Sequence, residues 1–172
     1  MINGFSHLGI ATRSIEESAR FYRLLGFRVA EPEEIEDQKV KVLFIETGST
    51  RIELLEPTHP DSPIARFLER RGPGMHHIAL EVDDLDSVLE HLAQQGVRLI
   101  DRQPRPGAEG RRIAFVHPES TGGVLVELCD AGGRPDRFAA SSRNRETRKD
   151  TPESEGYHRQ GQEESTSDPA KR

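Results

Sequence analysis

The stretch His7-Leu-Gly-Ile10 returns later in the chain as His77-Ile-Ala-Leu80, and this internal repeat decides the fold. The offset of 70 residues extends to two glycines, Gly26 and Gly96. Self-similarity at a fixed spacing indicates that one structural unit occurs twice. The sequence therefore predicts two copies of one module, with equivalent residues on opposite sides of a pseudo-twofold axis.

One amphipathic helix is predicted after the first strand of each copy. In the first copy Ser14 and Glu17 fit a capping box, and Gly26 stands where a helix ends. In the second copy Asp84 is the expected N-cap and Gly96 the expected stop. The apolar faces of the two helices are predicted to be Ile15, Ala19, Tyr22 and Leu25, and Leu85, Val88, Leu89 and Leu92.

A hairpin is predicted at the end of each copy. Apolar runs at residues 40–45 and 51–55 flank a turn at 47–50. The runs at 112–116 and 124–128 repeat this hairpin with a longer loop. Each copy is thus expected to fold as a βαβββ module.

Two such modules must combine, because one alone would leave an apolar sheet face exposed. The predicted fold class is α+β, with modules at about residues 4–57 and 74–130 paired around the pseudo-twofold axis. A linking helix is predicted over residues 62–71, opened by Ser62 and Pro63.

The composition changes sharply after the second module. From Gly132 to Arg172 the chain has few apolar side chains, too few to offset the entropy lost on ordering. We therefore predict a folded domain over residues 1–130 and a disordered polar tail over residues 131–172.

Charge and cysteine content limit the partners and the compartment. The net charge of −6 argues against binding nucleic acid. Cys129 is the single cysteine, which excludes an intramolecular disulfide and fits a reducing compartment. No apolar run approaches the roughly 20 residues of a membrane span, and the start of the chain lacks a signal peptide pattern. These features predict a cytoplasmic protein that binds neither membranes nor nucleic acid.

Four polar residues recur at matching places in the two copies. His7 and His77 open the first strand of each module, and Glu53 and Glu127 lie in the last strands, at an offset of 74. Both glutamates stand in apolar runs, where an ionised carboxylate is costly unless it is paired or bound to metal. Two nitrogens and two oxygens suit a borderline divalent ion such as Co²⁺, Mn²⁺, Ni²⁺, Fe²⁺ or Zn²⁺. We therefore predict one metal site formed by all four residues.

A plainer interpretation is weighed against this site. A lone strand histidine is usually a satisfied core or surface residue, and a lone glutamate in an alternating strand usually faces water. The symmetrical recurrence of both types favours the metal. His76 is expected to point to the opposite face from His77, and Cys129 is expected to be a small core or edge residue.

A loop rich in glycine, proline and arginine occupies residues 102–112. It could be an ordinary solvated hairpin loop. It could also close over the site, because the arginine fork matches phosphate and carboxylate groups. On the second interpretation Arg105 and Arg111 bind the substrate.

With these residues in hand, the chain resembles the vicinal-oxygen-chelate (glyoxalase/dioxygenase) superfamily, and within it the methylmalonyl-CoA epimerase family. The resemblance covers about residues 4–130. The segments that carry it are His7–Ala11, Ile52–Pro57, Asp61–Ala65, Gly74–Ile78, Pro106–Gly110, His117–Pro118 and Gly122–Leu128.

The resemblance implies a divalent metal held at the positions of His7, Glu53, His77 and Glu127, with Co²⁺ as the favoured ion and Mn²⁺, Ni²⁺ or Zn²⁺ as the other candidates. It implies epimerisation of (R)- and (S)-methylmalonyl-CoA through a metal-stabilised enolate, with Glu127 and Glu53 as proton-transfer groups. A homodimer that acts on a small acyl-CoA substrate is also implied.

Two departures and several alternatives stay open. Some relatives carry an additional glutamate where this chain has Val42, and some carry histidine where it has Glu109. A glyoxalase I-type lactoylglutathione lyase would use a similar site. A ring-cleaving dioxygenase is less favoured because it uses two histidines and one carboxylate, and a non-catalytic small-molecule-binding member would use the cleft without metal.

Overall fold

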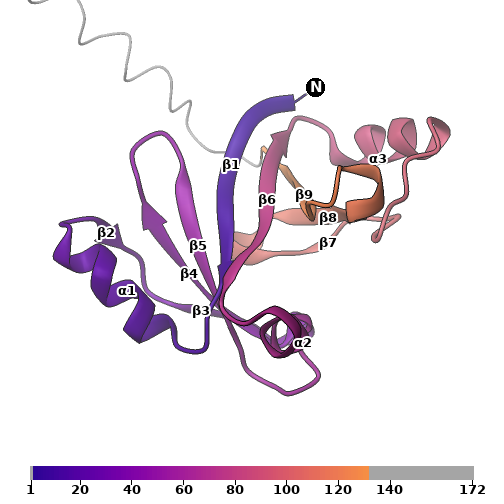
Figure 1. Cartoon of the computed structure of the whole chain (residues 1–172). Coiled ribbons are helices and arrows are strands. Elements are labelled where there is room, and N and C mark those ends of the chain that lie inside the picture. The colour runs from indigo at the N-terminus through magenta and orange to yellow at the C-terminus, as the bar shows by residue number, and fades with distance from the viewer. Residues whose placement is uncertain (1, 132–172) are drawn as a thin grey trace, which may run out of the picture. The chain divides into compact units, whose positions relative to one another are not determined.

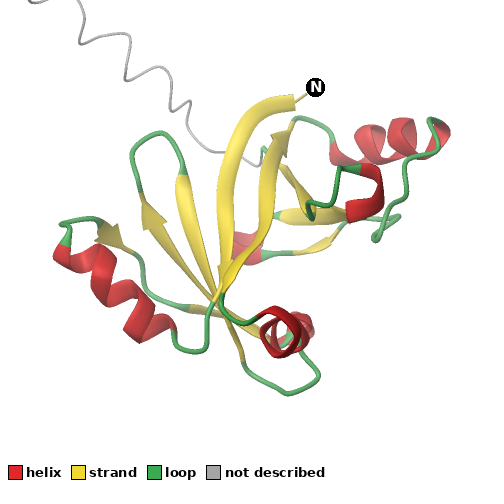
Figure 2. Ribbon diagram, in the orientation of Figure 1, coloured by secondary structure: helices red, strands yellow, loops and turns green. Residues whose placement is uncertain are grey.

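The computed structural model describes residues 2–131, and most of the tail predicted over residues 131–172 lies outside the described residues. Figure 2 shows strands forming the centre of the described part, with helices at their margins. The strands are β1 Ile2–Ala11, β2 Arg28–Val29, β3 Glu33–Ile35, β4 Val40–Glu46, β5 Arg51–Pro57, β6 Gly74–Val82, β7 Arg105–Pro106, β8 Arg112–Val116 and β9 Val126–Asp130. The α-helices are α1 Ile15–Leu24, α2 Pro63–Arg71 and α3 Leu85–Gln94, and short 3₁₀ turns cover Glu36–Gln38, Ala108–Gly110 and Pro118–Ser120.

The two modules meet along their first strands. β1 and β6 run antiparallel at the centre of a nine-stranded sheet within residues 2–131, in the order β2-β4-β5-β1-β6-β9-β8-β7, with β3 on β4 (Figure 1). β5 lies parallel to β1, and β9 lies parallel to β6 in the same way. This arrangement confirms the α+β class and the pairing of two repeated modules.

The modules differ in their short strands. The second module follows the predicted βαβββ order, whereas the first has one more strand, β2, because β3 on β4 corresponds to β7 on β8. The strand after the helix is minimal in both: β2 spans two residues, and its equivalent is a single bridge between Leu99 and Val116.

Both helix starts follow the sequence pattern. The Ser14 side chain accepts a hydrogen bond from the Glu17 backbone N–H, and Asp84 accepts one from Ser87. These caps satisfy backbone donors that have no partner inside the helix. Gly26 follows the end of α1 with φ 82°, in the left-handed region where glycine is favoured.

One residue of the predicted α1 face is not part of the core. Leu25 is 58% exposed, because α1 ends at Leu24 and Leu25 already belongs to its C-cap. Ile15 and Ala19 of the same predicted face are buried.

The core is divided between the two modules. Ile15 and Ala19 of α1 pack against Leu43 and Leu54 of the first module, and α3 packs its own apolar face on the second module. A further cluster joins α2 to the first module through Ile64. α1 and α3 therefore cover one face of the sheet, whereas Ile64 of α2 packs on the other face, where the central strands can carry polar side chains.

No helix in residues 2–131 is long and apolar enough to cross a membrane.

Candidate metal site

The four predicted site residues come from four adjacent strands at the centre of the sheet. His7 lies on β1, His77 on β6, Glu53 on β5 and Glu127 on β9. All four are buried, with exposed fractions between 3% and 5%. The repeat that aligned them in sequence thus brings them to one place in the fold.

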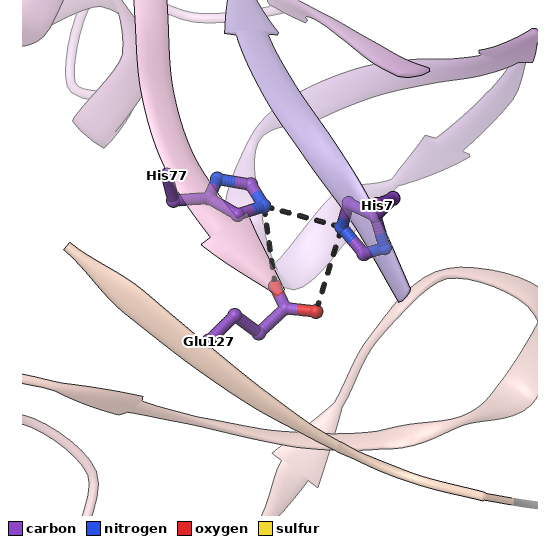
Figure 3. A group of neighbouring side chains, drawn as sticks. All are labelled: His7, His77 and Glu127. Atoms are coloured by element: carbon purple, nitrogen blue, oxygen red, sulfur yellow. Dashed lines mark hydrogen bonds and ion pairs between the residues drawn. The ribbon is translucent and has the colours of Figure 1, made fainter. Parts of the chain in front are cut away.

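Their polar atoms converge. The Nε2 atoms of His7 and His77 are 3.2 Å apart, and Glu53 Oε2 lies 3.4 Å from each of them. Glu127 lies on the second module, with its Oε1 3.7 Å from His7 Nε2 and its Oε2 3.7 Å from His77 Nε2. Figure 3 shows both imidazoles directed toward the Glu127 carboxylate.

These distances fit a divalent ion. Ligand atoms about 2.1 Å from a common ion lie roughly 3.0–3.4 Å apart in octahedral or tetrahedral geometry. The separations between the histidine nitrogens and the glutamate oxygens are close to that range. Ligand atoms of His7, His77 and Glu127 all lie within 4.8 Å of one another, and Glu53 adds an oxygen beside both histidines. The donor set therefore suits a divalent metal, without identifying which one.

The two carboxylates differ electrostatically. Burial raises the pKa of the Glu53 carboxyl, but hydrogen bonds and positive charge from His7 and His77 outweigh burial and lower that pKa to about 2. Burial raises the pKa of Glu127, and the histidine charges only partly oppose it. Burial lowers the pKa of His77, but Glu53 and Glu127 outweigh it and raise the value. A bound cation would offset the cost of burying the second carboxylate charge.

Neighbouring side chains fix the orientation of both imidazoles. Ser6 Oγ lies 3.2 Å from His7 Nδ1, and His76 Nδ1 lies 3.0 Å from His77 Nδ1. The rings of Phe44 and Phe115 make edge contacts with His7 and His77 at centroid distances of 5.6 and 5.5 Å. Contacts at Nδ1 leave Nε2 free to face the centre of the site.

The prediction that His76 points away from the site is wrong. His76 lines the same cavity as His77. The pairing of β1 with β6 shifts register here, because Gly9 pairs with His77 whereas Ile10 pairs with Met75. His76 is the extra residue of this bulge, and a bulge interrupts the alternation of strand side chains. Burial, followed by the charge of His77, lowers the pKa of His76 to about 4.

Gly9 makes room for the His77 ring. A Cβ atom at position 9 would lie 2.3 Å from His77 Cε1 and 2.4 Å from Nδ1. Ala79 holds the equivalent place in the second module: it lies opposite His7 in the same strand pair and is fully buried. The close approach of His77 to the β1 backbone thus requires glycine at position 9.

The four polar residues lie in a cavity of about 200 Å³. Its walls come from both modules and are largely apolar. Val42, where some relatives carry a third carboxylate, lines the cavity and is 1% exposed. Cys129 also lines it, and burial raises the pKa of its thiol to about 11, so the thiol is not poised as a nucleophile.

Arg105 and Arg111 both reach this cavity, but in different states. The Arg111 side chain is 8% exposed and already has partners: it pairs with Glu81 at 3.3 Å and donates to the Asp130 carbonyl oxygen. Arg105 is about one-third exposed, pairs with Asp101 at 3.1 Å and stacks over the Phe115 ring. Arg105 is therefore the arginine of this loop that can still meet a ligand.

Arg51 is a buried cation at the cavity wall that was not predicted from the sequence. Arg51 is 3% exposed, lines the cavity and donates two hydrogen bonds to the Glu109 carboxylate, at 2.7 and 2.9 Å. Its guanidinium also covers the Phe44 ring at 3.9 Å. Glu109 thus supplies the carboxylate that pairs with the buried Arg51 guanidinium.

The arginine-rich loop is docked onto the first module. Besides the Arg51–Glu109 pair, Gln38 donates to the Pro106 carbonyl and Glu33 accepts from the Glu109 backbone N–H. The loop therefore closes one side of the cavity in this structure.

Comparison with known proteins agrees with the fold and the site. Residues 6–115 match the Glyoxalase/Bleomycin resistance protein/Dioxygenase superfamily. The ethylmalonyl-CoA/methylmalonyl-CoA epimerase of Cereibacter sphaeroides is 40% identical over 131 residues, covering 74% of this chain and 98% of the relative. The chain belongs to the methylmalonyl-CoA epimerase family of this superfamily.

The chain is also similar to an uncharacterized bacterial protein and to a solved epimerase. The uncharacterized protein YqjC of Bacillus subtilis is 47% identical over 133 residues, which is 77% of this chain and 95% of that protein. A solved Streptomyces coelicolor methylmalonyl-CoA epimerase variant, in complex with 2-nitronate-propionyl-CoA, superposes with a TM-score of 0.74 at 34% identity. The superposed region covers 77% of this chain and 99% of the Streptomyces chain. The family resemblance inferred from the sequence is confirmed.

Proposed function

We propose that this protein interconverts (R)- and (S)-methylmalonyl-CoA in a metal-dependent epimerisation. One observation carries the proposal: two histidines and two glutamates converge, buried, in one cavity of a chain that belongs to the epimerase family. In our proposal His7, Glu53, His77 and Glu127 hold the metal.

The reaction moves one proton. The α-proton of the substrate lies between a thioester and a carboxylate, and its removal by a carboxylate base leaves a planar enolate. Return of a proton to the opposite face gives the other epimer. Glu53 and Glu127 come from the two modules, so the proposal assigns proton transfer to them.

A divalent ion bound here supplies positive charge beside the oxygen that becomes negative when the proton leaves. Co²⁺ is the ion we favour, with Mn²⁺, Ni²⁺ and Zn²⁺ as the other candidates for a nitrogen and oxygen site.

Val42 narrows the choice of base. The side chain at this position is apolar and buried, so it cannot accept a proton. Glu53 and Glu127 would then combine metal binding with proton transfer, or another group in the cavity must serve.

The arginines have separate proposed roles. Arg105 contacts the anionic part of the substrate, because it reaches the cavity and keeps an exposed portion. Arg111 shapes the cavity wall, because its guanidinium pairs with Glu81 and donates to the Asp130 carbonyl oxygen. Any contact with the substrate would use the part of the Arg111 side chain that these two partners leave uncovered.

The finer assignments come from the family. We propose a homodimer in the cytoplasm that acts on a small acyl-CoA in propionate metabolism. We also propose that residues 1–130 form the catalytic domain; nearly all of the tail predicted over residues 131–172 lies outside the described residues. Size-exclusion chromatography with light scattering checks the oligomeric state.

The proposal is tested by incubating metal-loaded protein with (S)-methylmalonyl-CoA and following the (R) form by a stereospecific coupled assay. We expect conversion by the wild type and its loss in His77→Ala. His59→Ala is the matched control, because His59 is more than half exposed and does not line the cavity. Turnover of the methylglyoxal–glutathione hemithioacetal in place of methylmalonyl-CoA would instead show the lyase.

A further inference from the structure

A buried arginine of the first module is linked to a proposed metal ligand through an aromatic ring. Arg51 lies on β5, where it is the strand-pair partner of His7 on β1. Its guanidinium lies over the face of the Phe44 ring, 3.9 Å from the ring centroid. The Phe44 ring in turn makes an edge contact with the His7 imidazole, with centroids 5.6 Å apart and ring planes at 79°. Arg51, Phe44 and His7 therefore form a continuous series of contacts that ends at the metal site.

A glutamate of the second module holds the outer end of this series. Both carboxylate oxygens of Glu109 accept hydrogen bonds from Arg51, at 2.7 and 2.9 Å. The backbone of Glu109 has φ 56°, in the left-handed region that residues other than glycine seldom adopt, and its N–H donates to Glu33. The arginine-rich loop is thus fixed in the conformation that brings this carboxylate to Arg51. A bidentate pair sets the orientation of the guanidinium as well as its position.

The second module contains a similar series of contacts at the other imidazole. Phe115 corresponds to Phe44 in the repeat, and its ring meets His77 edge-on at 5.5 Å, with ring planes at 87°. Arg105 lies over the Phe115 ring at 5.2 Å and pairs with Asp101. The two arginines come from strands that are not equivalent in the repeat, β5 and β7. Internal duplication alone therefore does not explain why an arginine lies over both rings.

The charge of Arg51 is already balanced within the cavity wall. Glu46 Oε1 lies 3.9 Å from the same guanidinium nitrogen that donates to Glu109. A guanidinium beside two carboxylates offers little net positive charge to an anionic ligand. Its flat face still packs on Phe44, and a planar cation is well suited to that contact. The contact with the ring is therefore the part of Arg51 that can act on the metal site.

We propose that Arg51 is a positioning residue for His7, acting through the Phe44 ring, and that Glu109 holds Arg51 in place. The inference rests on the proposed function, because His7 is one of its metal ligands. Ser6 Oγ lies 3.2 Å from His7 Nδ1, but one hydrogen bond still lets the imidazole plane turn. The edge contact with Phe44 restricts that rotation, so Nε2 stays directed at the centre of the site.

The first experiment observes the imidazoles of the metal-free full chain through assigned ¹H–¹³C signals of the histidine rings. The ring current of Phe44 makes the His7 signals sensitive to the angle between the two rings. The variants are Arg51→Lys, which keeps the charge but not the planar group, and Glu109→Ala, which leaves Arg51 in place. Arg112→Lys is the matched control, because Arg112 also pairs with two carboxylates but does not line the cavity.

We expect the His7 ring signals to shift in Arg51→Lys and in Glu109→Ala, and to shift further than those of His77, whose contact with Phe115 is unchanged. Arg112→Lys should leave both sets of signals in place. His7 signals that do not move, or that move no further than those of His77, overturn the inference. Melting temperatures of the metal-free proteins report whether each variant is folded, and Glu109→Ala carries the test if Arg51→Lys is not.

The second measurement is metal affinity, obtained by competition with a chelating dye. Loss of a contact around a metal ligand weakens binding about 10–100-fold, so we expect about tenfold weaker binding in Arg51→Lys and in Glu109→Ala. Because Glu109 acts through Arg51, the double variant should bind metal no more weakly than Arg51→Lys. In a Phe44→Leu background, Arg51→Lys should cause no further loss. Additive losses in either pair, or wild-type affinity in Arg51→Lys, overturn the inference.

Neither measurement needs turnover, so the inference and the proposed function can fail separately. A protein that gives the expected signal shifts but does not epimerise methylmalonyl-CoA overturns the proposed function and leaves the positioning role of Arg51 standing. A protein that epimerises methylmalonyl-CoA, while Arg51→Lys leaves the His7 signals unmoved, overturns only the positioning role.

Discussion

Substitution of Gly9 by alanine tests how tightly the site is built. The added Cβ would lie 2.3 Å from His77 Cε1, whereas ordinary contacts begin near 3.4 Å. The His77 ring must therefore move by about 1.1 Å, unless β1 and β6 separate. Metal–ligand distances in well-formed sites vary by only about 0.2 Å. A shift of this size removes His77 as a ligand.

We expect Gly9→Ala to weaken metal binding about 100-fold or more, because even loss of an outer-shell contact weakens metal binding by about 10–100-fold. Overpacking should also lower the free energy of unfolding by about 1–3 kcal/mol. Metal affinity is measured by competition with a chelating dye, and stability by urea denaturation of the metal-free protein.

The double variant Gly9→Ala/His77→Ala supplies the control. Without the imidazole the methyl group meets no obstacle, so adding Gly9→Ala to His77→Ala should cost little further stability. The reasoning is refuted if Gly9→Ala binds metal like the wild type, or if its cost in stability is the same with and without His77.

Three further predictions concern the scaffold. Leu54→Ala should lower the free energy of unfolding by about 2–5 kcal/mol, measured in urea, because Leu54 is 1% exposed in the core under α1. Glu109→Ala should lower the free energy of unfolding by about 2 kcal/mol relative to the wild type, since it removes both carboxylate acceptors from buried Arg51, and Glu109→Gln should lower it less because its amide keeps one acceptor oxygen; a Glu109→Ala variant as stable as the wild type would count against a structural role for this pair. Hydrogen bonds from Ser87 lower the pKa of Asp84, so the capping carboxylate stabilises the fold above its unfolded pKa, and this contribution is lost as the pH falls through the folded pKa. Asp84→Asn should therefore show a smaller drop in melting temperature between pH 7 and pH 3 than the wild type.

Much of the fold could be predicted because the sequence contains two copies of one structural module. The glycines at positions 26 and 96 end both helices, and the helix caps at Ser14 and Asp84 are local patterns that depend on neighbouring residues alone. Once two modules were aligned, their symmetry also indicated which histidines and glutamates would meet.

Other features depend on contacts that no local pattern reveals. The Arg51–Glu109 pair joins residues 58 positions apart in different modules. The position of His76 depends on a bulge in the pairing of β1 with β6, and strict strand alternation predicts the opposite face. The occupation of Arg111 by Glu81 and Asp130 likewise appears only when the strands that carry them are paired.

The most direct test of the central claim measures exchange of the substrate α-proton with D₂O at increasing metal occupancy. The metal-free protein is reconstituted in steps, and ¹H NMR follows loss of the methylmalonyl-CoA α-proton signal while elemental analysis gives bound metal per chain. The account predicts an exchange rate that rises in proportion to bound metal up to one ion per chain, and that stays near background in His77→Ala. Full exchange by metal-free protein, or no exchange at full occupancy, would contradict it.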